Sequence, residues 1–169
     1  VIGTPFANRS RTEFEQTVGV FVNPLVLRAN TQHDSVGEYL SHIKQVHLAA
    51  QQNQDMPFDR LVDELNIDRN MQHSPVFQIV LNADDGMNAL QQTQQGLPFA
   101  LQAKTLAHTN ARFDLEINLQ FDDSIAQLYW IYDNSIFTQE GTEQLHQHLE
   151  NMLQAMANAT DIQSLGELH

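Results

Sequence analysis

Histidines and carboxylates are the side chains with which this sequence could do acid–base or metal chemistry. The chain holds eight His, 21 Asp and Glu together, and no Cys. Zinc ligands on one helix are commonly four residues apart, whereas His42 and His47 are five apart and His146 and His148 are two apart. Neither pair shares a helix face well, and the sequence has no His-Glu-x-x-His pattern. Surface histidines are the preferred interpretation, and no metal site is predicted.

Patterns for nucleophilic catalysis and phosphate binding are missing from the sequence. The lack of Cys excludes a thiol nucleophile, a disulfide and a thiolate-bound metal within this chain. There is no Gly-x-Ser-x-Gly and no Walker A sequence. The carboxylates at 63–64, 114–116 and 122–123 are more typical of a charged surface than of an acid–base pair. Residue patterns alone therefore assign no catalytic residue.

Three segments carry more specific residues than a plain structural role needs. In residues 18–24 the polar Asn23 lies inside an apolar run, so its amide either bonds to nearby backbone or faces a cavity. Residues 53–58 (NQDMPF) would serve as a turn between two helices. Residues 69–75 (RNMQHSP) form a polar loop before a strand, where Arg69 could simply pair with acidic surface residues. For each segment both a structural and a functional interpretation remain open.

Length and charge limit the class of protein. A chain of 169 residues fits one domain, which we expect over 1–160, with 161–169 as the start of a linker. A formal net charge of -13 argues against nucleic acid or an anionic membrane as the main partner. No apolar run approaches the roughly 20 residues of a membrane helix, and no signal segment is recognised, so a cytoplasmic location is expected. Because Val1 already reads as strand, we expect a fragment of a longer polypeptide.

Apolar residues at helical spacing predict the helices. Residues 35–52 are a helix that begins with the capping-box pair Ser35 and Glu38. Residues 57–65 form a second helix, for which Asp55 is a plausible cap. Thr138 caps a third, long helix. Its apolar stripe is Leu145, Leu149, Met152, Leu153 and Met156.

Alternating and β-branched residues predict the strands. The chain starts in a strand that a turn at 3–5 ends, and the run 20–28 is an edge or bulged strand because Pro24 cannot donate to a ladder. Strands are also predicted at 76–82 and 113–121, the latter paired with 125–132 in a hairpin. The polar segment 83–111 is too long for a plain loop and is either functional or partly strand. The predicted fold class is an α/β (α+β) two-layer sandwich, a mixed sheet covered by helices.

The three specific segments resemble the motifs of condensation domains of non-ribosomal peptide synthetases. Residues 18–28 (VGVFVNPLVLR) resemble I-G-x-F-V-N-T-x-x-x-R, and residues 53–59 (NQDMPFD) resemble [HN]-Q-D-x-P-F-E. Residues 69–76 (RNMQHSPV) are a weaker match to R-D-x-S-R-N-P-L. The flanking Gly3-Thr4-Pro5, Arg9-Ser10-Arg11 and Arg112-Phe113-Asp114-Leu115 agree with the family. The departures are Pro24 in place of Thr, and Asn70, Gln72 and His73 in the third motif.

The resemblance implies half of a two-lobed enzyme. Each lobe of such domains is similar to chloramphenicol acetyltransferase, and carrier-bound substrates reach a tunnel between the lobes on phosphopantetheine arms. The catalytic His-His-x-x-x-Asp-Gly motif belongs to the N-terminal lobe, and this sequence has no adjacent His pair. The chain therefore resembles the C-terminal lobe alone, and by itself it is predicted to be inactive.

The resemblance also implies partners and site residues. The partners would be the N-terminal lobe, peptidyl carrier domains and an adjacent adenylation domain, with no bound cofactor beyond the carriers' arms. Alternatives are a degenerate platform that recruits a protein, an epimerisation-domain lobe, or a carrier-independent acyltransferase relative. The residues expected at the tunnel or between the lobes are Gly19, Phe21, Asn23, Asp55, Pro57, Phe58, Arg69, Ser74 and Pro75.

Overall fold

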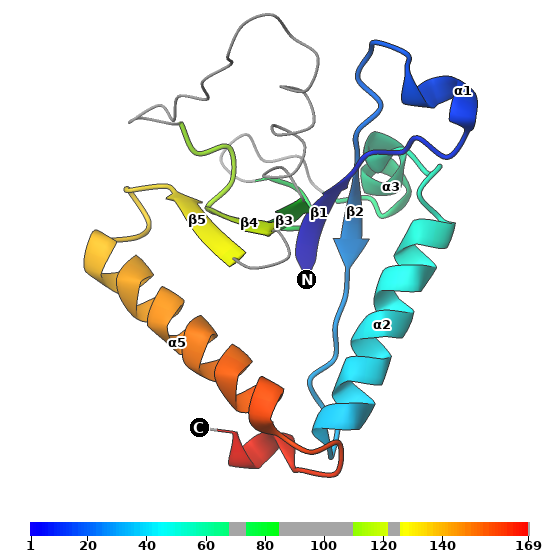
Figure 1. Ribbon diagram of the computed structural model, residues 1–169. Coiled ribbons are helices and arrows are strands. Elements are labelled where there is room, and N and C mark those ends of the chain that lie inside the picture. The colour runs from blue at the N-terminus through cyan, green and yellow to red at the C-terminus, as the bar shows by residue number, and fades with distance from the viewer. Residues whose placement is uncertain (68–73, 85–109, 122–125, 169) are drawn as a thin grey trace, which may run out of the picture.

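One five-stranded sheet organises the computed structural model, which describes residues 1–67, 74–84, 110–121 and 126–168 (Figure 1). The strand order is β2-β1-β3-β4-β5. The β1–β2 and β4–β5 pairs are antiparallel, whereas β1–β3 and β3–β4 are parallel, so the predicted mixed sheet is confirmed. The strands are β1 Ile2–Phe6, β2 Asn23–Leu27, β3 Ile79–Asp84, β4 Leu115–Phe121 and β5 Ala126–Tyr132.

Prolines explain why β2 lies at the edge of the sheet. Pro24 pairs with Pro5 of β1, and the outer side of β2 has no strand beside it in the sheet order. An edge strand tolerates a residue without an N–H, so the predicted edge position is confirmed. The predicted turn at 3–5 is wrong, because β1 continues to Phe6. Strand β2 is also shorter than the apolar run 20–28, since it begins only at Asn23.

The helices largely follow the local sequence signals. They are α1 Thr12–Glu15, α2 Val36–Gln52, α3 Phe58–Glu64, α5 Gln139–Asn158 and the 3-10 turn η1 Leu165–Glu167. The Ser35 hydroxyl accepts from the Glu38 amide at 3.3 Å, and the Thr138 hydroxyl accepts from the Gly141 amide at 3.1 Å. Both predicted N-caps are therefore confirmed. The Glu38 carboxylate accepts from the amide of Asp34 rather than from that of Ser35, so the capping box is displaced by one residue.

Aromatic rings form the centre of the core beside β1. Phe77 is 1% exposed, and its ring centroid lies 5.3 Å from that of Phe58 and 5.6 Å from that of Phe113. Gly3 gives this ring its space, because a Cβ atom there would overlap the Phe77 ring. Val62 of α3 is also buried. This cluster joins β1, α3 and the residues just before β3 and β4.

The long helices leave apolar side chains uncovered by the described part of the chain. In Figure 1, α2 and α5 run away from the two ends of the sheet and meet at η1. The predicted stripe of α5 is largely exposed, with Leu145 at 41% and Leu153 at 52%, and Leu40 of α2 is 48% exposed. No described helix is long and apolar enough to cross a membrane.

The C-terminal residues pack against the beginning of α2. The amides of Val36 and Gly37 donate to the carbonyl groups of Gln163 and Asp161, both at 3.0 Å, and Leu168 is buried. The linker predicted at 161–169 therefore overlaps residues that contact this helix, and its boundary stays a prediction. Of the predicted segment 83–111, Ala83 and Asp84 belong to β3, and residues 85–109 lie outside the described residues.

Candidate functional site

Asn23 joins the first two sequence motifs. Its side-chain Nδ2 donates to the Gln54 carbonyl at 2.9 Å and to the Met56 carbonyl at 2.7 Å. Its Oδ1 accepts from the Phe58 amide at 3.1 Å. Residues 53–58 turn the chain from α2 into α3, so one amide group on β2 holds this whole turn. The sequence left open whether Asn23 bonds to backbone or faces a cavity, and the structure contains the backbone bonds.

Counting donors and acceptors limits what else Asn23 can do. A primary amide has two N–H donors and an oxygen with two lone pairs. Both donors are used by Gln54 and Met56, and one lone pair is used by Phe58. A substrate could therefore meet this side chain only by donating a hydrogen bond to Oδ1. The geometry makes Asn23 a brace for its neighbours before it makes it a ligand.

The second motif begins α3 in a way that the sequence did not indicate. Asp55 was the predicted cap, but α3 starts at Phe58 with Pro57 in the N-cap position and no side-chain cap of its own. That prediction is wrong, because the amide of Phe58 bonds to Asn23 instead. Asp55 and Pro57 are exposed, whereas Phe58 is half-buried against Phe77. The motif thus combines a half-buried ring with an outward-facing polar turn.

The first half of motif one is a loop rather than a strand. Gly19 is exposed and lies against the half-buried Phe21 ring, 3.2 Å from where a Cβ would be. The exposed fraction of Val18 is 102% and that of Val20 is 96%, so neither side chain contacts the described part of the chain substantially. The guanidinium of Arg9 lies 4.4 Å from the centroid of the Phe21 ring. Arg9 was not among the predicted site residues, and its place in the flanking sequence was the only signal for it.

The third motif is only partly described. Arg69 and the other residues at 68–73 lie outside the described residues, so the structure gives no position for Arg69. Ser74 and Pro75 are half-buried, and the Gln78 side chain donates to the Ser74 carbonyl at 3.3 Å. Val76 has φ 74°, a value that costs a β-branched residue energy. The Phe77 amide donates to the Pro75 carbonyl at 2.9 Å and closes a γ-turn there.

Titratable groups do not converge in the described part of the chain. Described His, Asp and Glu side chains form no group of three that could hold a metal ion. His33 and His42 lie with ring centroids 4.6 Å apart in a hollow on α2, a pairing that sequence spacing did not predict. Bonds from the Ser135 hydroxyl and amide lower the pKa of Asp133 by favouring its charged form. Asp133 leads into α5 and belongs to none of the three motifs. The site can brace and contact substrates, and it offers no described acid–base pair.

Solved structures with the same fold define the class of protein. The chain matches the four-domain non-ribosomal peptide synthetase AB3403, bound to AMP and glycine, with a TM-score of 0.79 and 17% identity over 95% of this chain and 13% of that one. It matches the complex of the X-domain and OxyB from teicoplanin biosynthesis with a TM-score of 0.75 and 19% identity, over 99% of this chain and 37% of that one. The condensation domain of the Monacolin K polyketide synthase MokA gives a TM-score of 0.71 and 19% identity, over 93% and 36%. The fold is that of condensation domains.

Sequence relatives agree with the fold. A linear gramicidin synthase of Brevibacillus parabrevis is 37% identical over 159 residues, which are 93% of this chain and 3% of the relative. Phosphinothricin tripeptide synthetase PhsC of Streptomyces viridochromogenes is 33% identical over 93% of this chain and 14% of its own length. The condensation domain family model matches residues 1–167. The chain belongs to the condensation domain family, and it spans a small part of the curated relatives that it matches.

Proposed function

We propose that this chain is the C-terminal lobe of a condensation domain in a non-ribosomal peptide synthetase. The observation that carries the proposal is coverage: the family model spans residues 1–167, yet the chain covers only 36% of the solved MokA condensation domain chain. The exposed apolar side chains of α2 and α5 support it, because monomeric proteins rarely leave such faces open. The order of the three motifs supports the assignment to the C-terminal rather than the N-terminal lobe.

The reaction of the complete domain joins two carrier-bound substrates. The acceptor amine attacks the thioester carbonyl of the donor, so that a C–N bond forms as the C–S bond breaks and the donor carrier leaves as a thiol. A His of the other lobe would position or deprotonate the amine. Holding both phosphopantetheine arms in one tunnel would supply much of the rate by orientation. The partners in this proposal are the N-terminal lobe, the carrier domains and an adjacent adenylation domain, all in the cytoplasm.

This lobe would contribute one wall of the tunnel. The residues proposed there or between the lobes are Gly19, Phe21, Asn23, Asp55, Pro57, Phe58, Arg69, Ser74 and Pro75. The bonds of Asn23 support a bracing role, since they couple the start of β2 to the turn before α3. Asp55 and Pro57 are exposed residues of that turn and would face the substrate or a carrier.

The proposal is tested by supplying loaded donor and acceptor carriers. The complete domain of the parent synthetase should form the new amide on the acceptor carrier, detected by mass spectrometry. The 169-residue chain alone should give no rate above that without enzyme, because it lacks the His-His-x-x-x-Asp-Gly sequence. The matched control is the complete domain with the second His of that motif replaced by Ala. Turnover by the isolated chain would contradict the proposal.

A second candidate is a non-catalytic platform that recruits a protein. The match to an X-domain solved together with OxyB favours keeping it, since that structure pairs the same fold with a second protein. The parent gene separates the two functions. An intact His-His-x-x-x-Asp-Gly motif upstream of this chain supports condensation, and a broken motif supports the platform.

A further inference from the structure

Residues 18–22, which we call the valine loop, present apolar side chains to the outside. The exposed fractions are 102% for Val18, 96% for Val20 and 56% for Val22. Isolated exposed apolar residues are common and need no explanation. Three valines on one short segment, two of them almost wholly exposed, are a different case, because each loses hydrophobic stabilisation that burial would provide.

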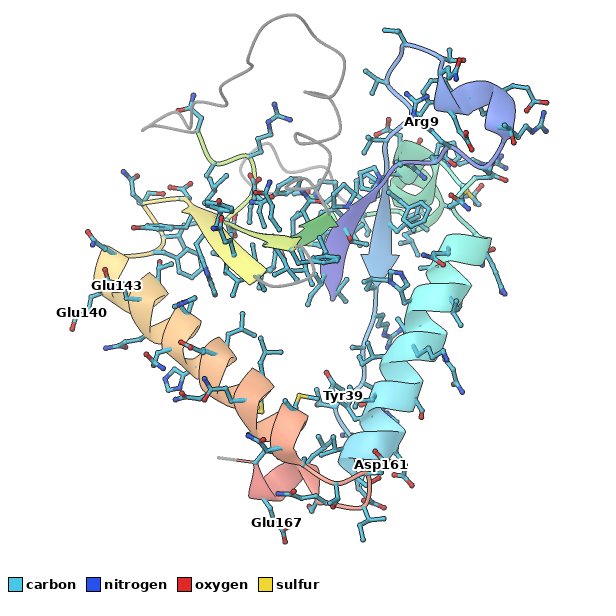
Figure 2. The ribbon with its side chains drawn as sticks, in the orientation of Figure 1. Arg9, Tyr39, Glu140, Glu143, Asp161 and Glu167 are labelled. Atoms are coloured by element: carbon cyan, nitrogen blue, oxygen red, sulfur yellow. The ribbon has the colours of Figure 1, made fainter. Side chains whose placement is uncertain are left out.

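Arg9 holds the valine loop in place. Its Nη1 donates to the carbonyl of Phe14 and, at 2.9 Å, to that of Thr17, and its Nη2 lies 3.4 Å from the carbonyl oxygen of Gly19. Its guanidinium also lies over the Phe21 ring, 4.4 Å from the centroid. Figure 2 shows Arg9 beside α1, at the end of β1 where the strand enters this region. One cation therefore contacts the loop at Gly19, at Phe21 and on the segment that leads into it.

The aromatic rings of the same region complete the support. The Phe14 and Phe21 ring centroids are 5.3 Å apart, and the Arg11 guanidinium lies 6.0 Å from the centroid of Phe14. These contacts place the polar and aromatic groups on the inner side of the loop. The valines are consequently held outward by a fixed scaffold, and a preorganised contact costs less conformational entropy on docking.

We propose that Arg9 is a positioning residue that holds Val18 and Val20 as an apolar contact to the remaining part of the same condensation domain. This inference rests on the proposed function, since it needs a second lobe. The occupant is argued from length, because the chain covers only 36% of a solved condensation domain chain and 37% of an X-domain chain. It is also argued from chemistry, because uncharged valine side chains fit an apolar surface that is permanently beside them better than a partner that must leave after each cycle.

Thiol labelling in the complete parent domain tests the contact without any turnover. Val18→Cys is treated with N-ethylmaleimide, and peptide mapping by mass spectrometry reads this site separately from other cysteines. The matched control is Glu140→Cys, an exposed charged position at the outer end of α5 (Figure 2). We expect Val18→Cys to react at least about tenfold more slowly than the control, because a docked side chain reacts only after local opening. Equal rates would overturn the contact.

Carriers provide a second arm of the labelling experiment. Protection of Val18→Cys should be the same with and without loaded carrier proteins. Protection that develops only when a carrier is added would assign the valine loop to the carrier and overturn the proposed occupant. Since labelling needs no peptide bond formation, the contact can fail while condensation activity stands, and activity can fail while protection stands.

Arg9 is tested by replacement in the same domain. Arg9→Gln should return the labelling rate of Val18→Cys to within about threefold of the control, and it should lower kcat/KM for peptide bond formation about tenfold with a change in Tm of less than about 3 °C. Arg9→Lys should not restore either value, because an ammonium group lacks the planar fork that reaches several carbonyl groups. Arg60→Gln, at an exposed ion pair with Glu64, should change neither. Full protection and activity in Arg9→Gln would refute the positioning role.

Discussion

The side-chain amide of Asn23 is the point at which the first two motifs depend on each other. Replacing Asn23 by Ala removes two donors and one acceptor at once. The carbonyls of Gln54 and Met56 and the amide of Phe58 then lose their partners. Because α3 has no other side-chain cap, the helix start is left open. The substitution should therefore loosen the turn between α2 and α3 without touching the aromatic core.

The magnitude follows from how far water can replace each lost bond. A net hydrogen bond is worth about 0.5–1.5 kcal/mol, and loss of a helix N-cap costs about 0.5–2 kcal/mol. The Met56 bond is exposed and can be replaced by water, whereas the Gln54 and Phe58 bonds are partly buried. We expect Asn23→Ala to lower the free energy of unfolding by about 1–3 kcal/mol. For a chain of this size that is a Tm decrease of about 2–10 °C.

Urea unfolding followed by circular dichroism measures this loss in the 169-residue chain, with activity measured per folded molecule in the parent domain. Asn23→Asp keeps the acceptor for Phe58 but places a carboxylate beside two carbonyls, so it should be no more stable than Asn23→Ala at neutral pH. The matched control is Asn158→Ala, where one exposed bond to Gln154 at 2.9 Å is lost and the change should stay within about 0.5 kcal/mol. An unchanged Tm in Asn23→Ala together with a large loss of activity would refute the bracing role and favour a direct contact with substrate.

Two further predictions concern packing and pH. Gly3→Ala should destabilise the fold by about 1–3 kcal/mol in urea unfolding, because its Cβ would overlap the enclosed Phe77 ring, whereas Gly166→Ala meets its nearest atom at 3.7 Å and should be tolerated; equal stabilities would contradict the close approach. Asp133 has its pKa lowered by hydrogen bonds from Ser135, so the stability that it contributes is present above its unfolded pKa and is lost as pH falls through the lower folded value. Carboxyl NMR titration should show Ser135→Ala raising the pKa of Asp133 toward its ordinary value, and an unchanged pKa would contradict this cause.

Local signals in the sequence determined the elements. Ser35 with Glu38 and Thr138 predicted two helix starts within a residue, because an N-cap bonds to an amide two or three positions away. The alternation over 113–121 predicted β4 as a half-buried strand, and Pro24 predicted an edge strand, because each depends on the residue's own backbone groups. The family could be recognised from the same residues, since two of its motifs are contiguous.

Tertiary structure alone decided how the site is held. Asp55 is the near neighbour that a local argument selects as the cap of α3, but the bond comes from Asn23, 35 residues before Phe58. The run 20–28 has the composition of one strand, yet Arg9 holds its first part as an exposed loop. In both cases the deciding partner is distant in sequence, and a hydrogen bond or ring contact carries no signal in the spacing of its two residues. Local backbone geometry can be read from neighbouring residues, whereas a bond across the fold exists only after the sheet has brought its ends together.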